Sequence, residues 1–234
     1  MSQLLIIDPA TRHLEVGAHQ HIKECTSLTC QVVAPALPTQ CLKGGALPNE
    51  ESPAAVIILG SGASPCEEIS WQRRLCAWLE GASGPLALGV PILAICYGHQ
   101  LLGQIFGAPV EQLWGGEKSA GLRSLSLDAP RLGIAGTGPL VVSHREGLTA
   151  LPVGWRGLTP SALPAMDCAG EVAYAVEAMV HEVEPWWGFQ AHIEAESTFL
   201  QQNGVDVARP VPYLGDRILH AFLQYCAPTR ALSS

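Results

Sequence analysis

The first half of the chain alternates between short apolar runs and longer amphipathic stretches. Four of the runs have the length and composition of strands that are buried on both faces of a sheet. These runs lie at residues 4–8, 30–34, 54–59 and 91–95. Between them, apolar positions recur at helical spacing, which predicts helices over residues 14–28, 67–79 and 97–106. Strands that alternate with helices in this way indicate a parallel sheet with helices on both faces.

After Gly107 the pattern changes to short runs in which apolar and polar residues alternate. Residues 122–127 and 139–143 predict antiparallel strands or hairpins beside the main sheet. Residues 173–180 and 186–193 complete the strand set, and residues 214–225 predict a closing helix. We therefore expect a single α/β domain over residues 1–234. Its doubly wound, mostly parallel sheet would carry a small antiparallel extension, as in flavodoxin-like folds.

Cys96 stands where the fourth apolar run turns into a helix, in Pro91-Ile-Leu-Ala-Ile-Cys-Tyr-Gly-His-Gln-Leu-Leu-Gly103. Small residues two positions before and after it, Ala94 and Gly98, would let the chain bend sharply and leave the cysteine side chain clear. A helix N-terminus also favours a thiolate and a nearby oxyanion. Taken alone, the same residue also fits a small buried hydrophobe, since the chain has eight cysteines.

A second candidate segment is Trp187-Gly-Phe-Gln-Ala-His-Ile-Glu194. On a strand, Gln190, His192 and Glu194 would share one face, so the carboxylate could hold one ring nitrogen of the histidine. The other ring nitrogen would then face a nucleophile, as nucleophilic catalysis requires. A half-exposed strand with a polar face would give the same pattern.

The third segment is Gly60-Ser61-Gly62, directly after a buried strand. Glycines let backbone N–H groups turn inward and bind an anion or a developing oxyanion. A nucleotide-binding loop is disfavoured because Pro65 stands where the third glycine of that fingerprint would be.

Composition narrows the class of protein. The hydrophobic content of 48% with 15% charged residues fits a well-buried globule, and the net charge of −8 argues against nucleic acid as a partner. The longest apolar stretch, residues 85–96, is too short to span a membrane and no signal peptide is evident, which indicates a cytoplasmic protein with reduced thiols. His19, His21, Cys25 and Cys30 cluster, but their spacing matches no standard zinc pattern, so we expect neither metal nor cofactor.

Two segments carry a family resemblance: the elbow segment at residues 91–103, which contains Cys96, and Gly-Phe-Gln-Ala-His-Ile-Glu at residues 188–194. Together they closely resemble the class I glutamine amidotransferases. The resemblance is to stand-alone members similar to the amidotransferase domain of GMP synthetase, and it spans nearly the whole chain. It implies that Cys96 is the nucleophile, His192 the general base and acid, and Glu194 the residue that orients the histidine.

The resemblance also implies a binding site around these residues. The oxyanion would be bound by the loop of Gly60, Ser61 and Gly62 and by the backbone N–H of Tyr97. Three further positions match residues that hold the substrate glutamine; they are Gln100, Ser143 and His144.

The chain departs from the family pattern at Ala191 and Ile193, where an aromatic residue and a proline are usual. The resulting prediction is hydrolysis of the glutamine side-chain amide through a γ-glutamyl thioester, with ammonia passed to a separate synthase partner. Because of these two altered positions, a second function also fits the sequence: a γ-glutamyl peptidase that acts on glutathione-like compounds. A non-catalytic regulatory module on this fold is the third alternative.

Overall fold

One sheet organises the molecule, which is a computed structural model describing residues 3–37, 47, 52–159, 163–166, 172–203 and 213–227. Its strands are β1 (Gln3–Ile7), β2 (Thr29–Val33), β3 (Ala55–Ile58), β4 (Ile92–Ile95), β9 (Trp155–Gly157), β12 (Ala178–His181) and β13 (Trp186–Phe189). Within the described residues they are ordered β2-β1-β3-β4-β13-β12-β9. The first five are parallel to one another, and β12 and β9 continue the sheet antiparallel. The predicted mostly parallel sheet is confirmed.

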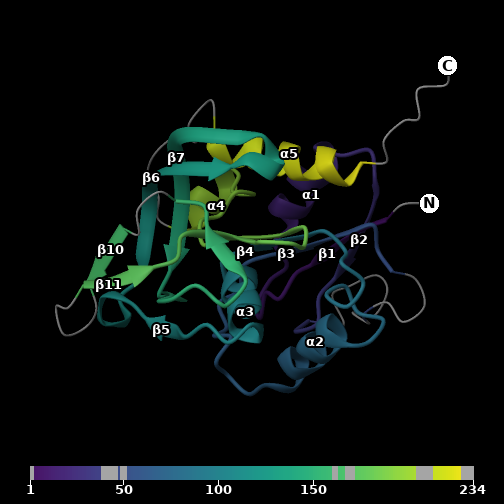
Figure 1. The fold of residues 1–234 in the computed structure, drawn as a ribbon, viewed down its shortest axis with the longest axis horizontal. Coiled ribbons are helices and arrows are strands. Elements are labelled where there is room, and N and C mark those ends of the chain that lie inside the picture. Colours follow the sequence, from purple (N-terminus) through teal and green to yellow (C-terminus); the bar gives the residue numbers. More distant parts are fainter. Residues whose placement is uncertain are drawn as a thin grey trace.

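Helices cover both faces of this sheet, as Figure 1 shows. Helices α1 (Val16–Glu24) and α5 (Leu214–Cys226) lie on one face, and α2 (Ser70–Glu80) and α3 (Tyr97–Ile105) on the other. The strands supply both cores because successive side chains point to opposite faces. In β1, for example, Leu4 and Ile6 belong to the core under α1 and α5, while Leu5 and Ile7 belong to the core under α2 and α3.

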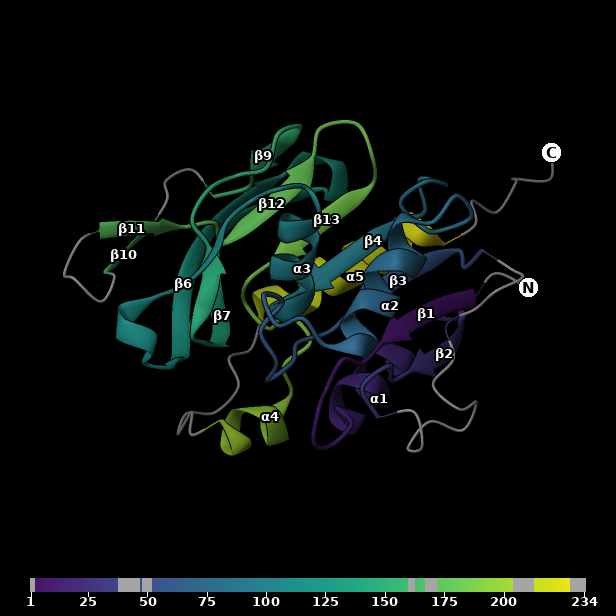
Figure 2. The ribbon, with the colours of Figure 1, turned by 90° about the horizontal axis from the view of Figure 1, so that it is seen from below.

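The antiparallel extension is built mainly by a long hairpin of β6 (Ser119–Ala129) and β7 (Ile134–His144) (Figure 2). Two smaller pairs accompany it, β5 (Val110–Gln112) with β8 (Glu146–Leu148), and β10 (Leu163–Met166) with β11 (Val172–Ala175). The start of α5 packs on the hairpin, where Leu214 lies within van der Waals distance of Gly138. The hairpin therefore belongs to the same core as the main sheet.

Two predicted strands differ from the structure. Residues 173–180 form two strands, because the chain leaves the ladder at Glu177, whose buried carboxylate forms an ion pair with Arg123 of β6. The strand predicted over residues 186–193 ends at Phe189. Beyond it the backbone N–H of His192 donates to Val141 of β7, so the chain has turned toward the hairpin. The predicted loop over residues 36–53 lies mostly outside the described residues.

No helix in the described ranges is long and apolar enough to cross a membrane.

The junction of β4 and α3 depends on a close approach at Gly98. A Cβ at this position would lie 2.5 Å from the carbonyl oxygen of Ile58 and 2.9 Å from its Cβ. Neither atom can move freely, because Ile58 is fully buried in β3. Gly98 therefore lets the first turn of α3 rest directly on the neighbouring strand.

We expect Gly98→Ala to lower the free energy of unfolding by about 1–3 kcal/mol. Alanine favours a helix over glycine by up to about 1 kcal/mol, but the clash with Ile58 outweighs that gain. Urea unfolding monitored by circular dichroism measures the change. The matched control is Gln104→Ala on the exposed side of α3, which should change stability by less than about 0.5 kcal/mol. Equal stability of Gly98→Ala and wild type would contradict this account of the junction.

Candidate active site

Cys96 lies at the tight bend between β4 and α3. Its backbone has φ 50° and ψ −103°, and it is the single non-glycine residue with positive φ in the part of the chain that the structure describes. Such a conformation costs roughly 1–3 kcal/mol. The bend is held by a hydrogen bond of 2.8 Å from the Cys96 N–H to the carbonyl of Phe189 in β13. The sulfur is therefore presented at the N-terminus of α3, where the unpaired N–H groups of the first helical turn favour negative charge.

His192 and Glu194 lie together in the turn that follows β13. Nδ1 of His192 donates to Oε1 of Glu194 at 2.8 Å, and both side chains are buried. Nε2 of the ring is also buried and makes no conventional hydrogen bond to a described residue. The predicted contact between the two side chains is present, but a turn produces it rather than the alternation of a strand. The arrangement leaves Nε2 available for proton transfer.

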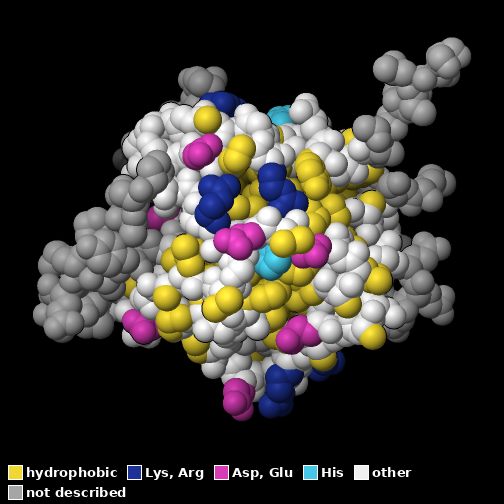
Figure 3. All heavy atoms as spheres, in the orientation of Figure 1, with side chains coloured by type: hydrophobic (Ala, Val, Ile, Leu, Met, Phe, Trp, Pro, Cys, Tyr) yellow, Lys and Arg dark blue, Asp and Glu magenta, His cyan; other side chains and the backbone are white. Residues whose placement is uncertain are grey.

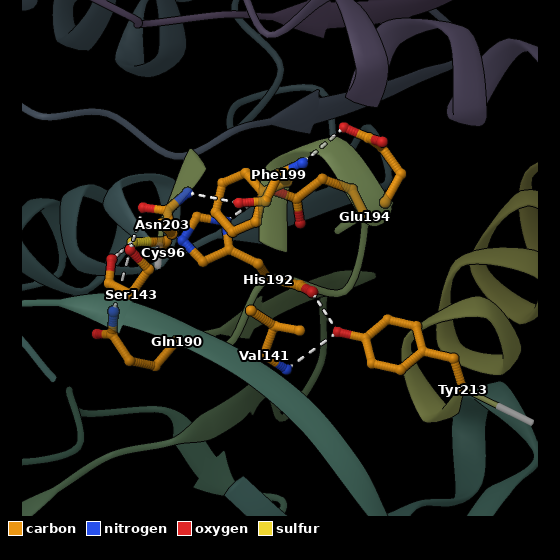
Figure 4. A network of polar contacts seen from close by, with 10 residues as sticks. Cys96, Val141, Ser143, Gln190, His192, Glu194, Phe199, Asn203 and Tyr213 are labelled. Atoms are coloured by element: carbon orange, nitrogen blue, oxygen red, sulfur yellow. Dashed lines mark hydrogen bonds and ion pairs between the residues drawn. The ribbon is translucent and has the colours of Figure 1, made fainter. Parts of the chain in front are cut away.

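Three neighbours fix the position of His192 (Figure 4). Its N–H donates to the carbonyl of Val141 at 2.8 Å, and its own carbonyl accepts from the Tyr213 hydroxyl at 2.6 Å. The same hydroxyl accepts from the N–H of Val141 at 3.1 Å. Phe199, from helix α4 (Ser197–Gln202), packs on the imidazole with ring centroids 4.4 Å apart. The ring therefore has little freedom to leave this orientation.

The charges around His192 favour its protonated form. Burial lowers the pKa of His192, but the charge of a Cys96 thiolate, followed by that of Glu194, raises it well above its usual 6.5. Negative charge on either neighbour therefore stabilises the imidazolium of His192. His144 behaves in the opposite way, because burial first, and then the charge of Arg123, lowers its pKa to about 3. These surroundings favour the charged form of His192 and the neutral form of His144.

The glycine loop approaches both Cys96 and His192 at Gly60. A Cβ on Gly60 would lie 2.8 Å from Cε1 of His192 and 3.6 Å from Cβ of Cys96. Ser61 is turned away, since its hydroxyl donates to the carbonyl of Pro9 at 2.7 Å. Gly62 is exposed, and its nearest neighbour is Thr11. The structure thus brings Gly60 to Cys96 and His192, and gives Ser61 and Gly62 other side-chain surroundings.

Tyr97 is the first residue of α3 and follows Cys96 directly. Its N–H is one of the groups of the first turn that have no hydrogen-bond acceptor within the helix. Its side chain points elsewhere, because the hydroxyl donates to Oε1 of Gln72 at 2.9 Å. Burial raises the pKa of the Tyr97 hydroxyl, which therefore stays protonated. Any contribution of Tyr97 to anion binding must come from its backbone.

The three residues expected to hold a substrate occupy different positions. The carbonyl of Ser143 lies 4.0 Å from the Cys96 sulfur, and its hydroxyl donates to Asn203 at 2.7 Å. His144 is buried. Nε2 of Gln100 donates to the carbonyl of Glu146 at 2.6 Å and to Oε1 of Gln190 at 3.1 Å. Both N–H bonds of that amide are engaged, so only its carbonyl oxygen remains for a substrate.

Several side chains at the site were not assigned a role from the sequence. Gln190 contacts the Cys96 sulfur, Phe199 packs on His192, and Asn203 accepts from both Ser143 and Lys118. Gln190 was detectable, because it precedes His192 by two residues in the motif. Phe199 and Asn203 come from α4 and its C-terminal end, and no local pattern marks them.

The cluster of histidines and cysteines considered for a metal is divided among other partners. His19 lies 2.7 Å from the buried carboxylate of Asp8, whereas His21 lies 3.0 Å from Asp216 of α5. Among the residues that the structure describes, no group of three or more His, Cys, Asp or Glu side chains is placed to hold a metal ion.

Comparison with known proteins identifies the family that this chain matches. A family model described as glutamine amidotransferase class-I matches residues 19–205. The chain is 32% identical to a subunit of the glutamine-hydrolysing GMP synthase of Archaeoglobus fulgidus over 123 residues, which are 52% of this chain and 60% of that protein. It is 27% identical to the corresponding subunit of Methanopyrus kandleri over 175 residues, covering 74% and 83% of the two chains.

Solved structures share the fold of this chain. A glutamine amidotransferase from Thermotoga maritima superimposes with a TM-score of 0.68 at 18% identity, covering 96% of this chain and 97% of that one. The chain spans 60% of the Archaeoglobus protein, and only 27% and 23% of the longer GMP synthases of Aromatoleum aromaticum and Thermus thermophilus.

The strain at position 96 can be measured with two substitutions. We expect Cys96→Gly to be more stable than Cys96→Ala, although glycine in a folded segment is ordinarily less stable than alanine by about 0.5–1 kcal/mol. The relief of about 1–3 kcal/mol of backbone strain exceeds that loss. Urea unfolding of the two proteins provides the comparison. If Cys96→Ala were the more stable variant, the strained conformation would be excluded.

The Glu194 carboxylate should set the alkaline limit of activity. Because Glu194 raises the pKa of His192, Glu194→Gln should lower it, so that the imidazolium is lost at lower pH. We expect the alkaline limb of the pH–rate profile to move to lower pH and kcat to fall by about 100-fold. The profile of kcat against pH on ammonia release from glutamine measures both. An unmoved alkaline limb would show that Glu194 does not act through His192.

Proposed function

The chain belongs to the class I glutamine amidotransferases, and on that premise we propose that it hydrolyses the side-chain amide of glutamine through Cys96, His192 and Glu194. The observation that carries the proposal is the meeting of three elements at the carboxyl end of the sheet. Gly60 after β3 lies against both Cys96 after β4 and His192 after β13, and Cys96 and His192 interact with each other through their side chains. Ligands of open α/β sheets bind at this end of the strands.

The first half of the reaction follows from the charges at the site. The Cys96 thiolate attacks the carboxamide carbon of glutamine, and the carbonyl oxygen becomes an oxyanion. Backbone N–H groups of the Gly60–Gly62 loop and of Tyr97 would bind this oxyanion; the loss of one such donor usually costs about 100- to 1000-fold in rate. The His192 imidazolium, kept protonated by its raised pKa, gives its proton to the departing nitrogen. Ammonia leaves, and a γ-glutamyl thioester remains on Cys96.

The second half regenerates the site. Neutral His192 takes a proton from water, which attacks the thioester carbon. The carbon–sulfur bond breaks, glutamate leaves, and Cys96 is again a thiolate beside an imidazolium. Glu194 accepts the hydrogen bond from Nδ1 throughout, so Nε2 alone exchanges protons with the reacting atoms.

The fate of the ammonia is a separate part of the proposal. The relatives from Archaeoglobus fulgidus and Methanopyrus kandleri are both named as subunits of a glutamine-hydrolysing GMP synthase. We infer that this chain likewise passes its ammonia to a separate synthase partner.

The rival γ-glutamyl peptidase rested on the unusual Ala191 and Ile193. Both side chains are fully buried in the core under α1 and α5. Ile193 packs against the start of α5, where a Cβ on Gly215 would lie 2.4 Å from the Ile193 carbonyl oxygen. These residues can change the substrate pocket only indirectly, so nothing in their positions favours a peptide over ammonia as leaving group.

Two substrates separate the alternatives. We expect wild-type protein to release ammonia from glutamine at a higher kcat/KM than it cleaves the γ-glutamyl bond of glutathione. Cys96→Ala should abolish either activity, while Cys66→Ser, at an exposed free cysteine, should leave both unchanged. Ammonia release is measured with a coupled glutamate dehydrogenase assay, and glutathione cleavage by chromatography of the products.

Each contrary result has a distinct meaning. A preference for glutathione would establish the peptidase. No hydrolysis of either compound, with or without a synthase partner, would support the non-catalytic module. Full activity of Cys96→Ala would overturn both enzymatic functions.

A further inference from the structure

A buried chain of amide groups ends at the Cys96 sulfur. Nε2 of Gln190 lies 3.7 Å from Sγ of Cys96, within the range of a hydrogen bond to sulfur, and the residue is fully buried. Figure 4 shows the Gln190 amide directed toward Cys96 and Ser143. Gln190 comes immediately after β13, the strand whose last carbonyl already holds the Cys96 N–H. The same segment thus contacts the nucleophile through its backbone and through a side chain.

The orientation of the Gln190 amide is set from its other end. Its Oε1 accepts from Nε2 of Gln100 at 3.1 Å, and that nitrogen also donates to the carbonyl of Glu146 at 2.6 Å. Gln100 can only donate through its nitrogen, so the oxygen of Gln190 must face Gln100 and its NH₂ group must face the sulfur. The backbone of Gln190 is held as well, because its N–H donates to the carbonyl of Glu177 at 2.9 Å.

The two hydrogen-bonding neighbours of the sulfur favour different protonation states. The carbonyl of Ser143, at 4.0 Å, can only accept, and so it pairs with the thiol form of Cys96. The NH₂ group of Gln190 can only donate, and its hydrogen bond is stronger to a thiolate than to a neutral thiol. Successive amides polarise one another in the same direction, which strengthens the last donor of the chain.

We propose that Gln190 is a further catalytic residue, which donates a hydrogen bond to the Cys96 thiolate and is oriented for this by Gln100. The assignment rests on the proposed nucleophilic role of Cys96 and adds a donor to it. Gln100 then acts as a positioning residue through its nitrogen, in addition to any substrate contact of its oxygen. No new covalent step is involved, because Gln190 neither gains nor loses a proton.

The test uses alkylation of Cys96 by iodoacetamide across a range of pH, with the modified Cys96 peptide quantified by mass spectrometry to separate it from the other cysteines. Only the thiolate reacts at a useful rate. In Gln190→Met, we expect the midpoint of this pH profile to move to higher pH by about one pH unit. Gln190→Glu, which also adds a negative charge, should move it further in the same direction. Gln100→Met should cause a smaller movement, because the amide of Gln190 remains but loses its orientation.

The matched control is Gln104→Met. Gln104 is an exposed glutamine on α3, the helix that carries Gln100, so this change should leave the midpoint and the activity unchanged. Circular dichroism and urea unfolding establish which variants keep the fold. On glutamine, Gln190→Met should lose about tenfold in kcat/KM at pH values below its shifted midpoint, and much of this loss should disappear at higher pH.

The alkylation profile needs no substrate, so it is independent of the proposed function. A shifted midpoint in a protein that hydrolyses no glutamine, with or without a synthase partner, would support the hydrogen bond from Gln190 to the thiolate and overturn the glutaminase proposal. Folded Gln190→Met and Gln190→Glu proteins with the wild-type midpoint would overturn the role of Gln190. A loss of activity that is equal at all pH values would likewise assign Gln190 to packing alone.

Discussion

The bend at Cys96 is the constraint on which the rest of the site depends. A non-glycine residue with φ of 50° persists only when its surroundings hold it there. Here β4 lies between β3 and β13 with every residue buried, Gly98 allows α3 to rest on Ile58, and the carbonyl of Phe189 binds the Cys96 N–H. The direction of the sulfur is therefore set by the buried central strands of the sheet, and the first turn of α3 begins beside it.

His192 is placed by a different constraint, the need to pair charges that are buried. An imidazolium alone would be strongly unfavourable at the buried position of His192, and the charges of Cys96 and Glu194 offset that cost. The turn that carries them leaves the sheet and attaches to β7 through Val141 and to α5 through Tyr213. The antiparallel hairpin and the closing helix, which are remote from Cys96 in sequence, thus determine where His192 lies. The elbow and this turn converge at Gly60.

The sequence predicted the parts of the site whose signal is local. The elbow at Cys96 and its two small neighbours were readable from one apolar run followed by helical spacing, and the contact of His192 with Glu194 from two motif positions. The strand assumed for that contact was wrong, because the chain turns at Gln190 to pair with β7, a long-range event that alternation cannot reveal. The contacts of Phe199, Asn203 and Tyr213 with the site depend on how α4 and α5 pack. No local sequence pattern in these segments predicts them. Tertiary packing also decided that Ala191 and Ile193 belong to the core.

We propose that the strained cysteine acts as an acyl-transfer nucleophile and that the buried histidine exchanges protons with it. Acid quenching of wild-type protein during turnover of glutamine, followed by mass spectrometry of its peptides, tests this most directly. We expect a γ-glutamyl group on the peptide that contains Cys96, sensitive to hydroxylamine as a thioester is, and absent from His192→Ala protein quenched in the same way. Turnover of glutamine with no such adduct at any quench time, or with the adduct on another cysteine, would contradict it.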